Sequence, residues 1–369
     1  MKKIMFLLIV IFAMLALAAC DGNGVLMPEP EENAQEANDN YDLECVDEDV
    51  CESIDTEEEE LTQPYEDEEE SDEEHEEPST PKTAEDSKVL MIGDVVLNPN
   101  HPDLDLSNRE LTEEDIAPLR YMTHLTKLDL SGNAIIDLSQ TYISELVNLR
   151  HLNLSTNRIT DEWHREVYFL EDISELAHLT ELRHLNLNNN AISDLSPLAH
   201  LTNLTSLNAV TNLIDDISPL AGLTNLEGLY IGGLLWYTDI SYVANLTNLH
   251  GLDLSSSRLE DITPLASLTN LVWLNLSGNH GITDITPLSG LTSLQSLSIA
   301  NASINDLTPL AGLTNIYRLN ISDLNWRDEP LTDLSPLASL TNLEWLVIYG
   351  HGNYIDDWSY VAHVAQVTP

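Results

Sequence analysis

Apolar and polar residues repeat with one pattern over most of the chain, from residue 104 to the C-terminus. The clearest copy, residues 192–207, reads I-x-D-[IL]-[ST]-P-L-A-x-L-T-N-L-x-x-L. Close copies occupy residues 214–229, 259–274 and 304–319, and the period is about 22 residues. Periods of roughly 20–50 residues are typical of solenoids, in which each repeat buries its apolar face only against its neighbours.

Each repeat is predicted to contain a strand, a turn and a short helical piece. Leu185 and Leu187 alternate with polar residues, which predicts a strand with one buried face. Ser196-Pro197 predicts an N-cap followed by the first helical residue. The piece from Pro197 to His200 is too short for an α-helix and suits a 3₁₀ turn. The fold class is therefore an α/β repeat solenoid with a parallel sheet on one face and 3₁₀ turns on the other.

Ten full repeats follow an irregular first one, so residues 104–369 are predicted to hold about eleven repeats. The full repeats begin at Leu125, Leu149, Leu182, Leu204, Leu226, Leu249, Leu271, Leu294, Ile316 and Leu343. Short apolar runs in residues 88–103 predict an N-terminal cap, and the last repeat is expected to be the C-terminal cap. At about 4.8 Å per strand, the sheet would be roughly 50 Å long.

Two polar residue types recur at fixed places in the repeat. Asparagine follows the strand at Asn133, Asn157, Asn190, Asn212 and Asn279, whereas Leu234, Ser257 and Ala302 replace it in other repeats. Stacked amides there are expected to bond backbone groups of the turns. Aspartate precedes the helical piece at Asp194, Asp216, Asp239, Asp261, Asp284, Asp306 and Asp333. Because the aspartates recur in every such repeat, a structural role as acceptors of backbone N–H groups is favoured over catalysis.

The N-terminus has the features of an export signal. Lys2 and Lys3 precede an apolar run from Ile4 to Leu17, which is short for a membrane span. The sequence Leu17-Ala18-Ala19-Cys20 resembles the bacterial lipobox, which implies a signal peptide over residues 1–19 and lipidation of Cys20. Several acyl chains on one residue would give stable membrane anchoring. The alternatives are an ordinary signal peptide with an incidental cysteine, or an uncleaved anchor.

Acidic residues dominate the segment after the signal and set the charge of the whole chain. The formal net charge is −49, from 14 Lys and Arg against 63 Asp and Glu. Runs such as Glu57–Glu60 and Glu66–Glu70 predict that residues 20–87 form a lipidated N-terminus and a disordered acidic linker. This linker would serve as a stalk, or merely as a solubilising tail. So few cations disfavour binding to nucleic acid and to anionic lipid head groups.

The remaining cysteines, Cys45 and Cys51, also lie in the acidic segment. In an exported protein they could form a disulfide, with free thiols as the alternative. The flanking carboxylates lack EF-hand spacing, which favours solvated charges over a calcium site. The sequence therefore predicts no metal site and no cofactor.

The repeats resemble those of the bacterial internalin-type leucine-rich-repeat proteins, whose strand motif LxxLxLxxNxI is followed by xDIxPLxxLTN. The resemblance covers residues 104–369 and implies a horseshoe with its sheet on the concave face, where partners dock. The end, residues 356–364, is similar to the closing repeat of clostridial leucine-rich-repeat lipoproteins. The chain departs from internalins in lacking a recognisable helical cap and a sortase signal. The combined features suggest a bacterial lipoprotein with an internalin-like domain.

The candidate partner-binding residues are outward positions on the predicted sheet that carry aromatic rings or a cation. They are Tyr230, Trp273, Arg318, Trp345 and Tyr349. Exposed aromatic side chains on a rigid surface anchor interfaces, and they also stack on sugar rings. Alternatively, these rings only pack against their neighbours. His151 and His184 occupy equivalent positions in successive repeats, but lack an obvious third metal ligand.

Four departures from the period mark insertions, which often lie on a binding face. They fall within residues 162–170, 234–237, 325–330 and 349–354. No phosphate loop, HExxH, CxxC or GxSxG motif is present, so no catalysis is expected. The sequence favours an extracytoplasmic, lipid-anchored protein that binds an extracellular or surface protein. The alternative hypotheses are a carbohydrate- or cell-wall-binding module and, third, a spacer without a ligand.

Overall fold

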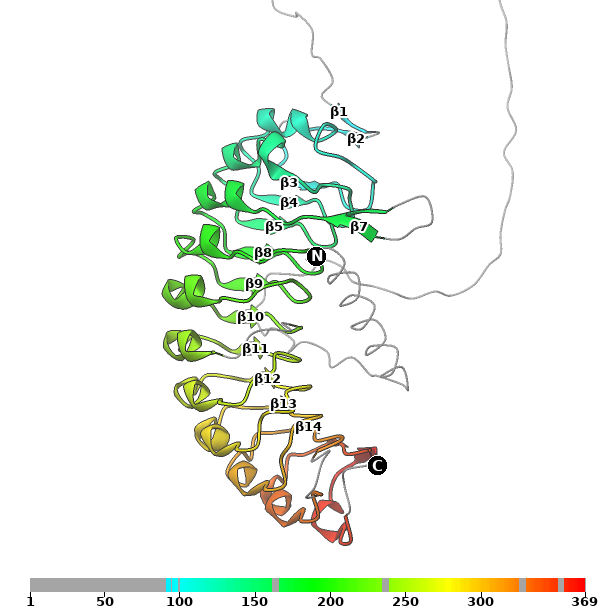
Figure 1. Ribbon diagram of the computed structural model, residues 1–369, viewed down its shortest axis with the longest axis vertical. Coiled ribbons are helices and arrows are strands. Elements are labelled where there is room, and N and C mark those ends of the chain that lie inside the picture. The colour runs from blue at the N-terminus through cyan, green and yellow to red at the C-terminus, as the bar shows by residue number, and fades with distance from the viewer. Residues whose placement is uncertain are drawn as a thin grey trace, which may run out of the picture. The chain divides into compact units, whose positions relative to one another are not determined.

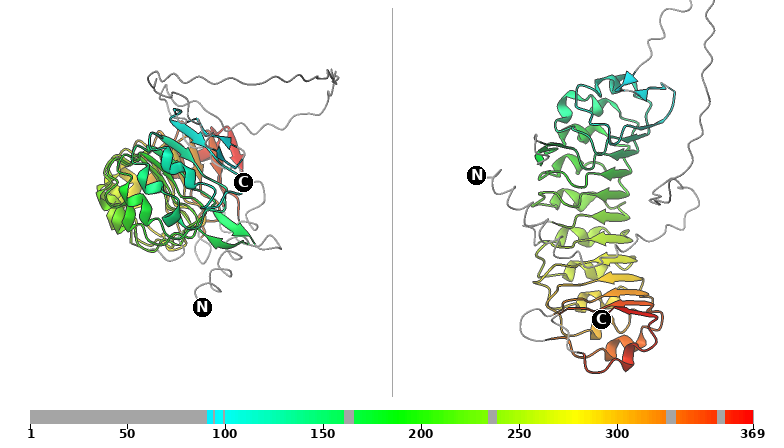
Figure 2. Two further views of the ribbon diagram at one scale, coloured as in Figure 1. Left: turned by 90° about the horizontal axis from the view of Figure 1, so that it is seen from above. Right: turned by 90° about the vertical axis from the view of Figure 1, so that its right-hand side faces the viewer.

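The computed structural model describes residues 91–93, 95–98, 100–160, 166–233, 239–324, 330–350 and 355–368. Within these residues the repeats form one parallel sheet of twelve strands, with short 3₁₀ turns on the opposite side (Figures 1 and 2). The sheet confirms the predicted leucine-rich-repeat horseshoe. Its strands are β3 (Asp103–Asp105), β4 (Lys127–Asp129), β5 (His151–Asn153), β8 (His184–Asn186), β9 (Ser206–Asn208), β10 (Gly228–Tyr230), β11 (Gly251–Asp253), β12 (Trp273–Asn275), β13 (Ser296–Ser298), β14 (Arg318–Asn320), β15 (Trp345–Val347) and β16 (Gln366–Thr368).

The convex side is built from 3₁₀ turns of three to five residues, as the sequence predicted. They are η1 (Ala117–Tyr121), η2 (Leu138–Gln140), η3 (Ile143–Glu145), η4 (Ser174–His178), η5 (Ser196–Leu198), η6 (Ser218–Gly222), η7 (Ser241–Asn245), η8 (Thr263–Ser267), η9 (Thr286–Gly290), η10 (Thr308–Leu310), η11 (Ser335–Ser339) and η12 (Ser359–Val361). None of the helices in the described ranges is long and apolar enough to span a bilayer.

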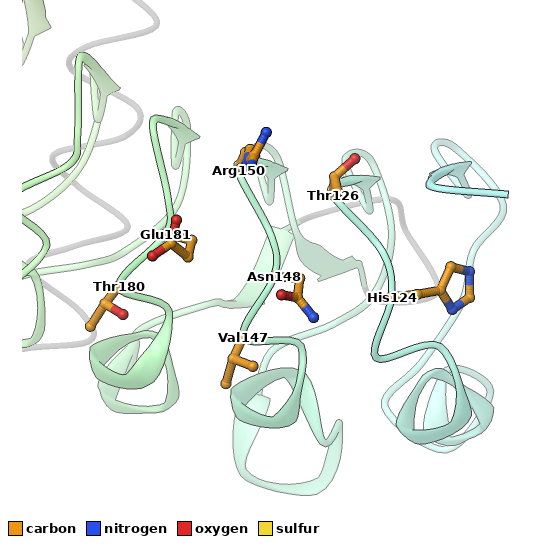
Figure 3. A pocket seen from close by; sticks show the side chains of 7 residues that line it. All are labelled: His124, Thr126, Val147, Asn148, Arg150, Thr180 and Glu181. Atoms are coloured by element: carbon orange, nitrogen blue, oxygen red, sulfur yellow. The ribbon is translucent and has the colours of Figure 1, made fainter. Parts of the chain in front are cut away.

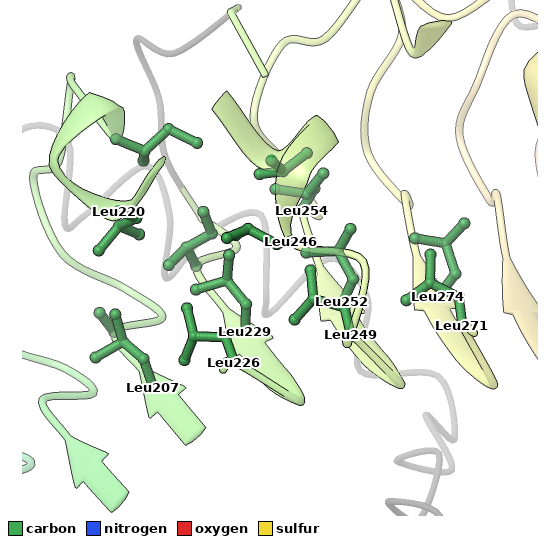
Figure 4. Close-up of a cluster of buried hydrophobic side chains, with 14 of the residues drawn as sticks. Leu207, Leu220, Leu226, Leu229, Leu246, Leu249, Leu252, Leu254, Leu271 and Leu274 are labelled. Carbon is green, nitrogen blue, oxygen red and sulfur yellow. The ribbon is translucent and has the colours of Figure 1, made fainter. Parts of the chain in front are cut away.

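The repeat leucines and isoleucines fill a continuous core between the sheet and the 3₁₀ turns (Figure 4). Leu226 and Leu229 of one repeat, for example, are fully buried beside Leu249 and Leu252 of the next. Truncating one such leucine to alanine costs about 2–5 kcal/mol. Each repeat therefore depends on its neighbours for most of its stability.

Two short antiparallel strands, β1 (Met91–Ile92) and β2 (Val95–Val96), precede the sheet. Ile92 and Leu97 are buried and belong to the same apolar core as the repeats. These two residues therefore share the core of the repeats, and the N-terminal cap over residues 88–103 stays a prediction.

The predicted asparagines form what we term the inner ladder, Asn133, Asn157, Asn190, Asn212 and Asn279, and all five are buried. Asn190 shows the arrangement: its Nδ2 donates to the carbonyls of Leu154 and Leu187, both at 2.9 Å. Its Oδ1 accepts from the Asn157 N–H at 3.0 Å. Each amide thus joins two repeats, which confirms the expected role.

A second set of asparagines, which sequence reasoning missed, links the repeats at the exposed surface. In this outer ladder each Nδ2 donates to a threonine carbonyl of the preceding repeat at 2.8–2.9 Å. Its members are Asn148, Asn203, Asn225, Asn248, Asn270, Asn315 and Asn342. The asparagine of the LTN motif is therefore a connector between repeats.

The recurring aspartates begin the 3₁₀ turns. Asp194 Oδ1 accepts from the Ser196 N–H at 2.7 Å, and the six equivalent aspartates repeat this bond. The helical turn η5 begins at Ser196 with Leu195 as its N-cap residue, so the predicted start at Pro197 was one residue late. The structural role of the aspartates is confirmed.

The C-terminal end of the sheet and the insertion near residue 162 contain elements that the sequence did not predict, and several predicted features lie outside the described residues. The sheet has a twelfth strand, β16, because the chain after residue 364 pairs in register with β15. The insertion near residue 162 contains an antiparallel hairpin of β6 (Arg158–Thr160) and β7 (Glu166–Phe169), seen projecting from the repeats in Figure 1. Cys20, Cys45, Cys51, most of the other insertions and the whole acidic linker lie outside the described residues.

Candidate functional site

The concave sheet presents two columns of outward side chains, because the parallel strands pair in register. The first column is Asp103, Lys127, His151, His184, Ser206, Gly228, Gly251, Trp273, Ser296, Arg318, Trp345 and Gln366. The second is Asp105, Asp129, Asn153, Asn186, Asn208, Tyr230, Asp253, Asn275, Ser298, Asn320, Val347 and Thr368. Most of these side chains are small or polar, so the few large ones define the candidate sites.

Tyr230 and Trp273 form an aromatic pair in the middle of the sheet. Their ring centroids are 5.8 Å apart and the rings are tilted by 51°. Two glycines make room for this arrangement. A Cβ at Gly251 would lie 2.8 Å from the Tyr230 hydroxyl, and one at Gly228 would lie 3.0 Å from its ring. The tyrosine ring therefore lies across β10 and β11 and reaches the tryptophan on β12.

This packing corrects one expectation about Trp273. The sequence predicted an exposed tryptophan at this outward position, but its side chain is only 9% exposed. The side chain is buried because the glycines on β10 and β11 leave space for Tyr230 to lean against it. Trp273 therefore belongs to the floor of the site rather than to its rim.

Arg318 and Trp345 form a second pair, on β14 and β15. The guanidinium carbon of Arg318 lies 3.5 Å from the centroid of the Trp345 ring and 5.7 Å from that of Tyr317. Such cation–π contacts stabilise by about 0.5–2 kcal/mol, depending on desolvation. The guanidinium therefore covers one face of the Trp345 ring.

Two buried donors of this region lack acceptors within the described part of the chain. They are Trp273 Nε1 and Arg318 Nε, on strands separated by β13 alone. A buried donor without a partner costs about 1–3 kcal/mol. A ligand that rearranges this surface and offers an oxygen to either donor would recover part of that cost.

Asp253 adds a carboxylate next to Tyr230, its neighbour in the sheet register. Burial raises the pKa of Asp253, although the Ser255 N–H donates to the carboxylate at 2.8 Å. The floor of the aromatic region is thus poorly solvated. Polar contacts made there by a ligand would be stronger than at an open surface.

Tyr349 lies two residues beyond β15 and is 44% exposed. It makes no ring contact with the other four candidates among the described residues. The structure therefore brings Tyr230 to Trp273 and Arg318 to Trp345, and leaves Tyr349 as a separate, open ring.

The N-terminal third of the sheet has a different character. The rings of His151 and His184 stack with centroids 4.5 Å apart and planes 9° from parallel. Lys127 adjoins this pair on β4, and Arg150 and Arg183 precede the two histidines in the chain. Sequence reasoning noted the histidines but missed this concentration of cations, although Arg-His occurs twice at equivalent places. No cluster of three metal-ligating side chains is found among the described residues.

A hollow of about 590 Å³ lies beside these cations (Figure 3). Its lining residues are His124, Thr126, Val147, Asn148, Arg150, Thr180 and Glu181. Two of these side chains form hydrogen bonds with the backbone: Asn148 donates to the Thr123 carbonyl, and His124 Nε2 bonds with the His101 carbonyl. Arg150 and Glu181 remain as the charged groups at its rim.

Sequence comparison places the chain among leucine-rich-repeat proteins. A family profile described as Leucine Rich repeats (2 copies) matches residues 247–290 and 269–312, and one described as Leucine rich repeat matches residues 103–159. No curated protein sequence matches the chain.

Several solved structures resemble this one. An internalin (inlF) from Listeria monocytogenes is 32% identical, with a TM-score of 0.63, over 74% of this chain and 83% of that chain. An internalin C2 (inlC2) from the same organism is 34% identical, with a TM-score of 0.40, over 61% and 82% of the two chains. A plant peptide hormone receptor, RGFR1 in complex with RGF2, shares the fold at 21% identity and a TM-score of 0.56, over 74% and 48%.

Proposed function

The chain belongs to the internalin-type leucine-rich-repeat family, and on this premise we propose that its concave sheet binds a protein partner and performs no catalysis. Leucine-rich-repeat proteins generally mediate protein–protein interaction. The observation that carries the proposal for this chain is the paired arrangement of Tyr230 with Trp273 and Arg318 with Trp345.

These four side chains have the properties of interface hot spots. Tryptophan, tyrosine and arginine are the residue types that contribute most binding energy in protein interfaces. Each of the four is fixed by a neighbour on a rigid sheet, so little side-chain entropy would be lost on binding. The buried donors Trp273 Nε1 and Arg318 Nε lack hydrogen-bond acceptors, and the carbonyl oxygens of a bound peptide would supply them.

A carbohydrate is the second candidate, favoured by the open ring of Tyr349. Stacking on a sugar needs an accessible aromatic face. Trp273 is buried, and Arg318 covers one face of Trp345. The paired residues therefore suit a protein surface better than a sugar ring.

We further propose that the protein is lipid-anchored through Cys20 and acts outside the cytoplasm, with residues 20–87 as a spacer. The support is the lipobox-like sequence Leu17-Ala18-Ala19-Cys20. Cells grown with an alkyne-labelled fatty acid should incorporate the label into the wild-type chain and not into Cys20→Ser. Labelling of both chains, or of neither, would contradict the anchor.

Affinity capture with the full chain tests the binding proposal. The wild-type chain is expected to capture a specific surface protein, and Arg318→Ala or Trp345→Ala should weaken its affinity by about 30-fold, the loss typical of a hot spot of about 2 kcal/mol. Trp273→Ala, which removes part of the floor, should act in the same direction. Tyr242→Ala is the matched control, because Tyr242 is an exposed tyrosine on the convex turn η7.

A subtler perturbation moves a ring without deleting it. Gly251→Ala would push the Tyr230 hydroxyl away from its place, whereas a Cβ at Gly290 meets nothing within 4 Å. Binding should fall for Gly251→Ala and not for Gly290→Ala. Equal binding by all variants would contradict a role of the aromatic residues in binding. Strong glycan-array signals without protein capture would favour a carbohydrate ligand over a protein partner.

A further inference from the structure

Cations are concentrated at one place on the concave sheet of a strongly acidic chain. Lys127, Arg150, His151, Arg183 and His184 lie on or just before three adjacent strands, β4, β5 and β8, and all five side chains are exposed. We call them the cationic stretch. The chain has 14 Lys and Arg against 63 Asp and Glu, so three of these cations on adjacent strands are an unusual concentration of positive charge.

The cationic stretch is an ordered array. Lys127, His151 and His184 are direct neighbours in the sheet register. Arg150 and Arg183 are adjacent as well, because the Arg183 N–H donates to the Arg150 carbonyl at 2.8 Å. With strands about 4.8 Å apart, the five side chains cover two parallel rows that extend roughly 10 Å across the sheet.

The groups around this array include carboxylates on β3 and β4 and at the adjoining hollow. Lys127, Arg150 and Arg183 form no ion pair with any residue that the structure describes. Asp103 on β3 ends one row, and Glu181 lies at the rim of the adjoining hollow (Figure 3). Asp105 and Asp129 lie in the second column: the Ser107 N–H and, to a smaller extent, the charge of Lys127 lower the pKa of Asp105, and Asp129 accepts hydrogen bonds from Ser131 and Asn153.

We propose that the cationic stretch binds an acidic peptide segment of the protein partner. This inference rests on the proposed protein-binding role of the concave sheet and names the chemistry of one part of that partner. An extended peptide places alternate side chains about 6.8 Å apart, so two carboxylates fit within the roughly 10 Å of the array. Arginine pairs with carboxylates in a bidentate manner, and the two histidines supply further donors.

The net charge of the chain does not prevent this contact. At about 0.15 M ionic strength the Debye length is about 8 Å, so carboxylates farther from the stretch are largely screened. The same screening makes the contact sensitive to salt. The acidic segment should therefore bind best at low ionic strength and weaken as salt is added.

The stacked histidines make the contact pH-dependent. The His151 ring is exposed but partly desolvated, which lowers its pKa; His184, Lys127 and Arg183 lower this pKa further, whereas Asp103 on β3 raises it. A bound carboxylate would favour the protonated ring, so binding takes up protons. Affinity should rise as the pH falls from about 7.5 to 5.5, before glutamate side chains with a pKa of about 4.3 become protonated.

Fluorescence anisotropy with the full chain and two labelled peptides, octaglutamate and octaglutamine, tests the proposal. Octaglutamate should bind at 50 mM salt and octaglutamine should not. The double variant Arg150→Gln/Arg183→Gln should bind at least about fivefold more weakly, since two charge contacts of modest strength are removed. Arg120→Gln, which removes a cation on the convex turn η1, should change the affinity less than twofold.

Several results would overturn the inference. They are equal binding of the two peptides, unchanged binding by the double variant, or binding of polygalacturonate in place of octaglutamate. The pH dependence of octaglutamate affinity should disappear in His151→Gln/His184→Gln. If it persists in that variant, the histidines do not take part in the contact. Arg318→Ala separates the two proposals, because octaglutamate binding should survive it even where capture of the surface protein is lost.

Discussion

Asn279 is an inner-ladder residue whose removal should have a large and easily interpreted effect. Its Nδ2 donates to the carbonyls of Leu254 and Leu276 at 2.9 and 2.8 Å. Its Oδ1 accepts from the N–H groups of Ser257 and Leu259, both at 3.0 Å. The side chain is fully buried, so no solvent can replace these four bonds in Asn279→Ala.

The size of the effect follows from this count. A typical hydrogen bond contributes about 1 kcal/mol net, so the loss of four bonds should lower the free energy of unfolding by about 4 kcal/mol. Asn270→Ala is the matched comparison in the outer ladder. Asn270 makes one exposed bond, to the Thr247 carbonyl at 2.9 Å, and water can satisfy the freed carbonyl. That variant should lose less than about 1 kcal/mol.

Urea unfolding followed by circular dichroism and tryptophan fluorescence measures both values. The comparison is valid where the two variants keep the urea dependence of the wild type, because a changed slope would mean that the solenoid unfolds in parts. Equal destabilisation by the two alanine variants would refute the reasoning. A loss below about 1 kcal/mol for Asn279→Ala would do so as well.

Two further predictions concern carboxylates. The Thr263 N–H donates to the Asp261 carboxylate and lowers its pKa, as equivalent N–H groups do at other turns. The ionised carboxylate therefore stabilises the fold at neutral pH, and this stabilisation should be lost as the pH falls below about 4. When the urea midpoint is measured from pH 7 to 3, it should fall less in Asp261→Asn than in the wild type. Burial raises the pKa of Asp253, so its charge opposes folding at neutral pH. Asp253→Asn should raise the urea midpoint at pH 7, with a smaller gain at pH 4, and a gain that does not shrink would contradict this cause.

The repeat architecture was predictable because the same local constraints recur in copy after copy. Leu185 and Leu187 show the strand period, and the aspartate before each Ser-Pro or Thr-Pro shows where the 3₁₀ turn starts. The inner ladder was predictable for the same reason. Positions 324 and 351 were exceptions: leucine and histidine replace the ladder asparagine there, and the insertions in these two repeats obscure the period.

Features that depend on contacts between repeats were harder to predict. The burial of Trp273 results from glycines on β10 and β11, which the sequence of its own repeat does not reveal. The outer ladder uses the carbonyl of the preceding repeat, so Asn203 read alone suggests only a turn. The cationic stretch likewise becomes visible only when Arg150 and Arg183 are placed on adjacent strands.

The interrupted inner ladder offers a test at the level of single amides. Leu259 and Ile304 occupy equivalent positions in their repeats and both are fully buried. The Leu259 N–H donates to Asn279, but the corresponding acceptor for Ile304 would come from residue 324, which is leucine. The Ile304 N–H has no acceptor among the described residues, so the local opening that exposes it to solvent deuterium breaks no hydrogen bond of that N–H. We therefore expect the Ile304 amide to exchange about tenfold faster than that of Leu259, which corresponds to one bond of about 1.4 kcal/mol.

Replacing the leucine tests whether the missing acceptor is the cause. Leu324→Asn keeps a branched side chain of similar size at a fully buried position and supplies the oxygen that Ile304 lacks. Because the substitution also removes apolar burial, the overall stability need not rise, and the exchange rate of the one amide is the informative quantity. Exchange at Ile304 should slow to about the rate at Leu259, while Leu259 itself stays unchanged. Fast exchange that persists at Ile304 in Leu324→Asn would mean that local opening of the C-terminal repeats, and not the absent ladder bond, controls that amide.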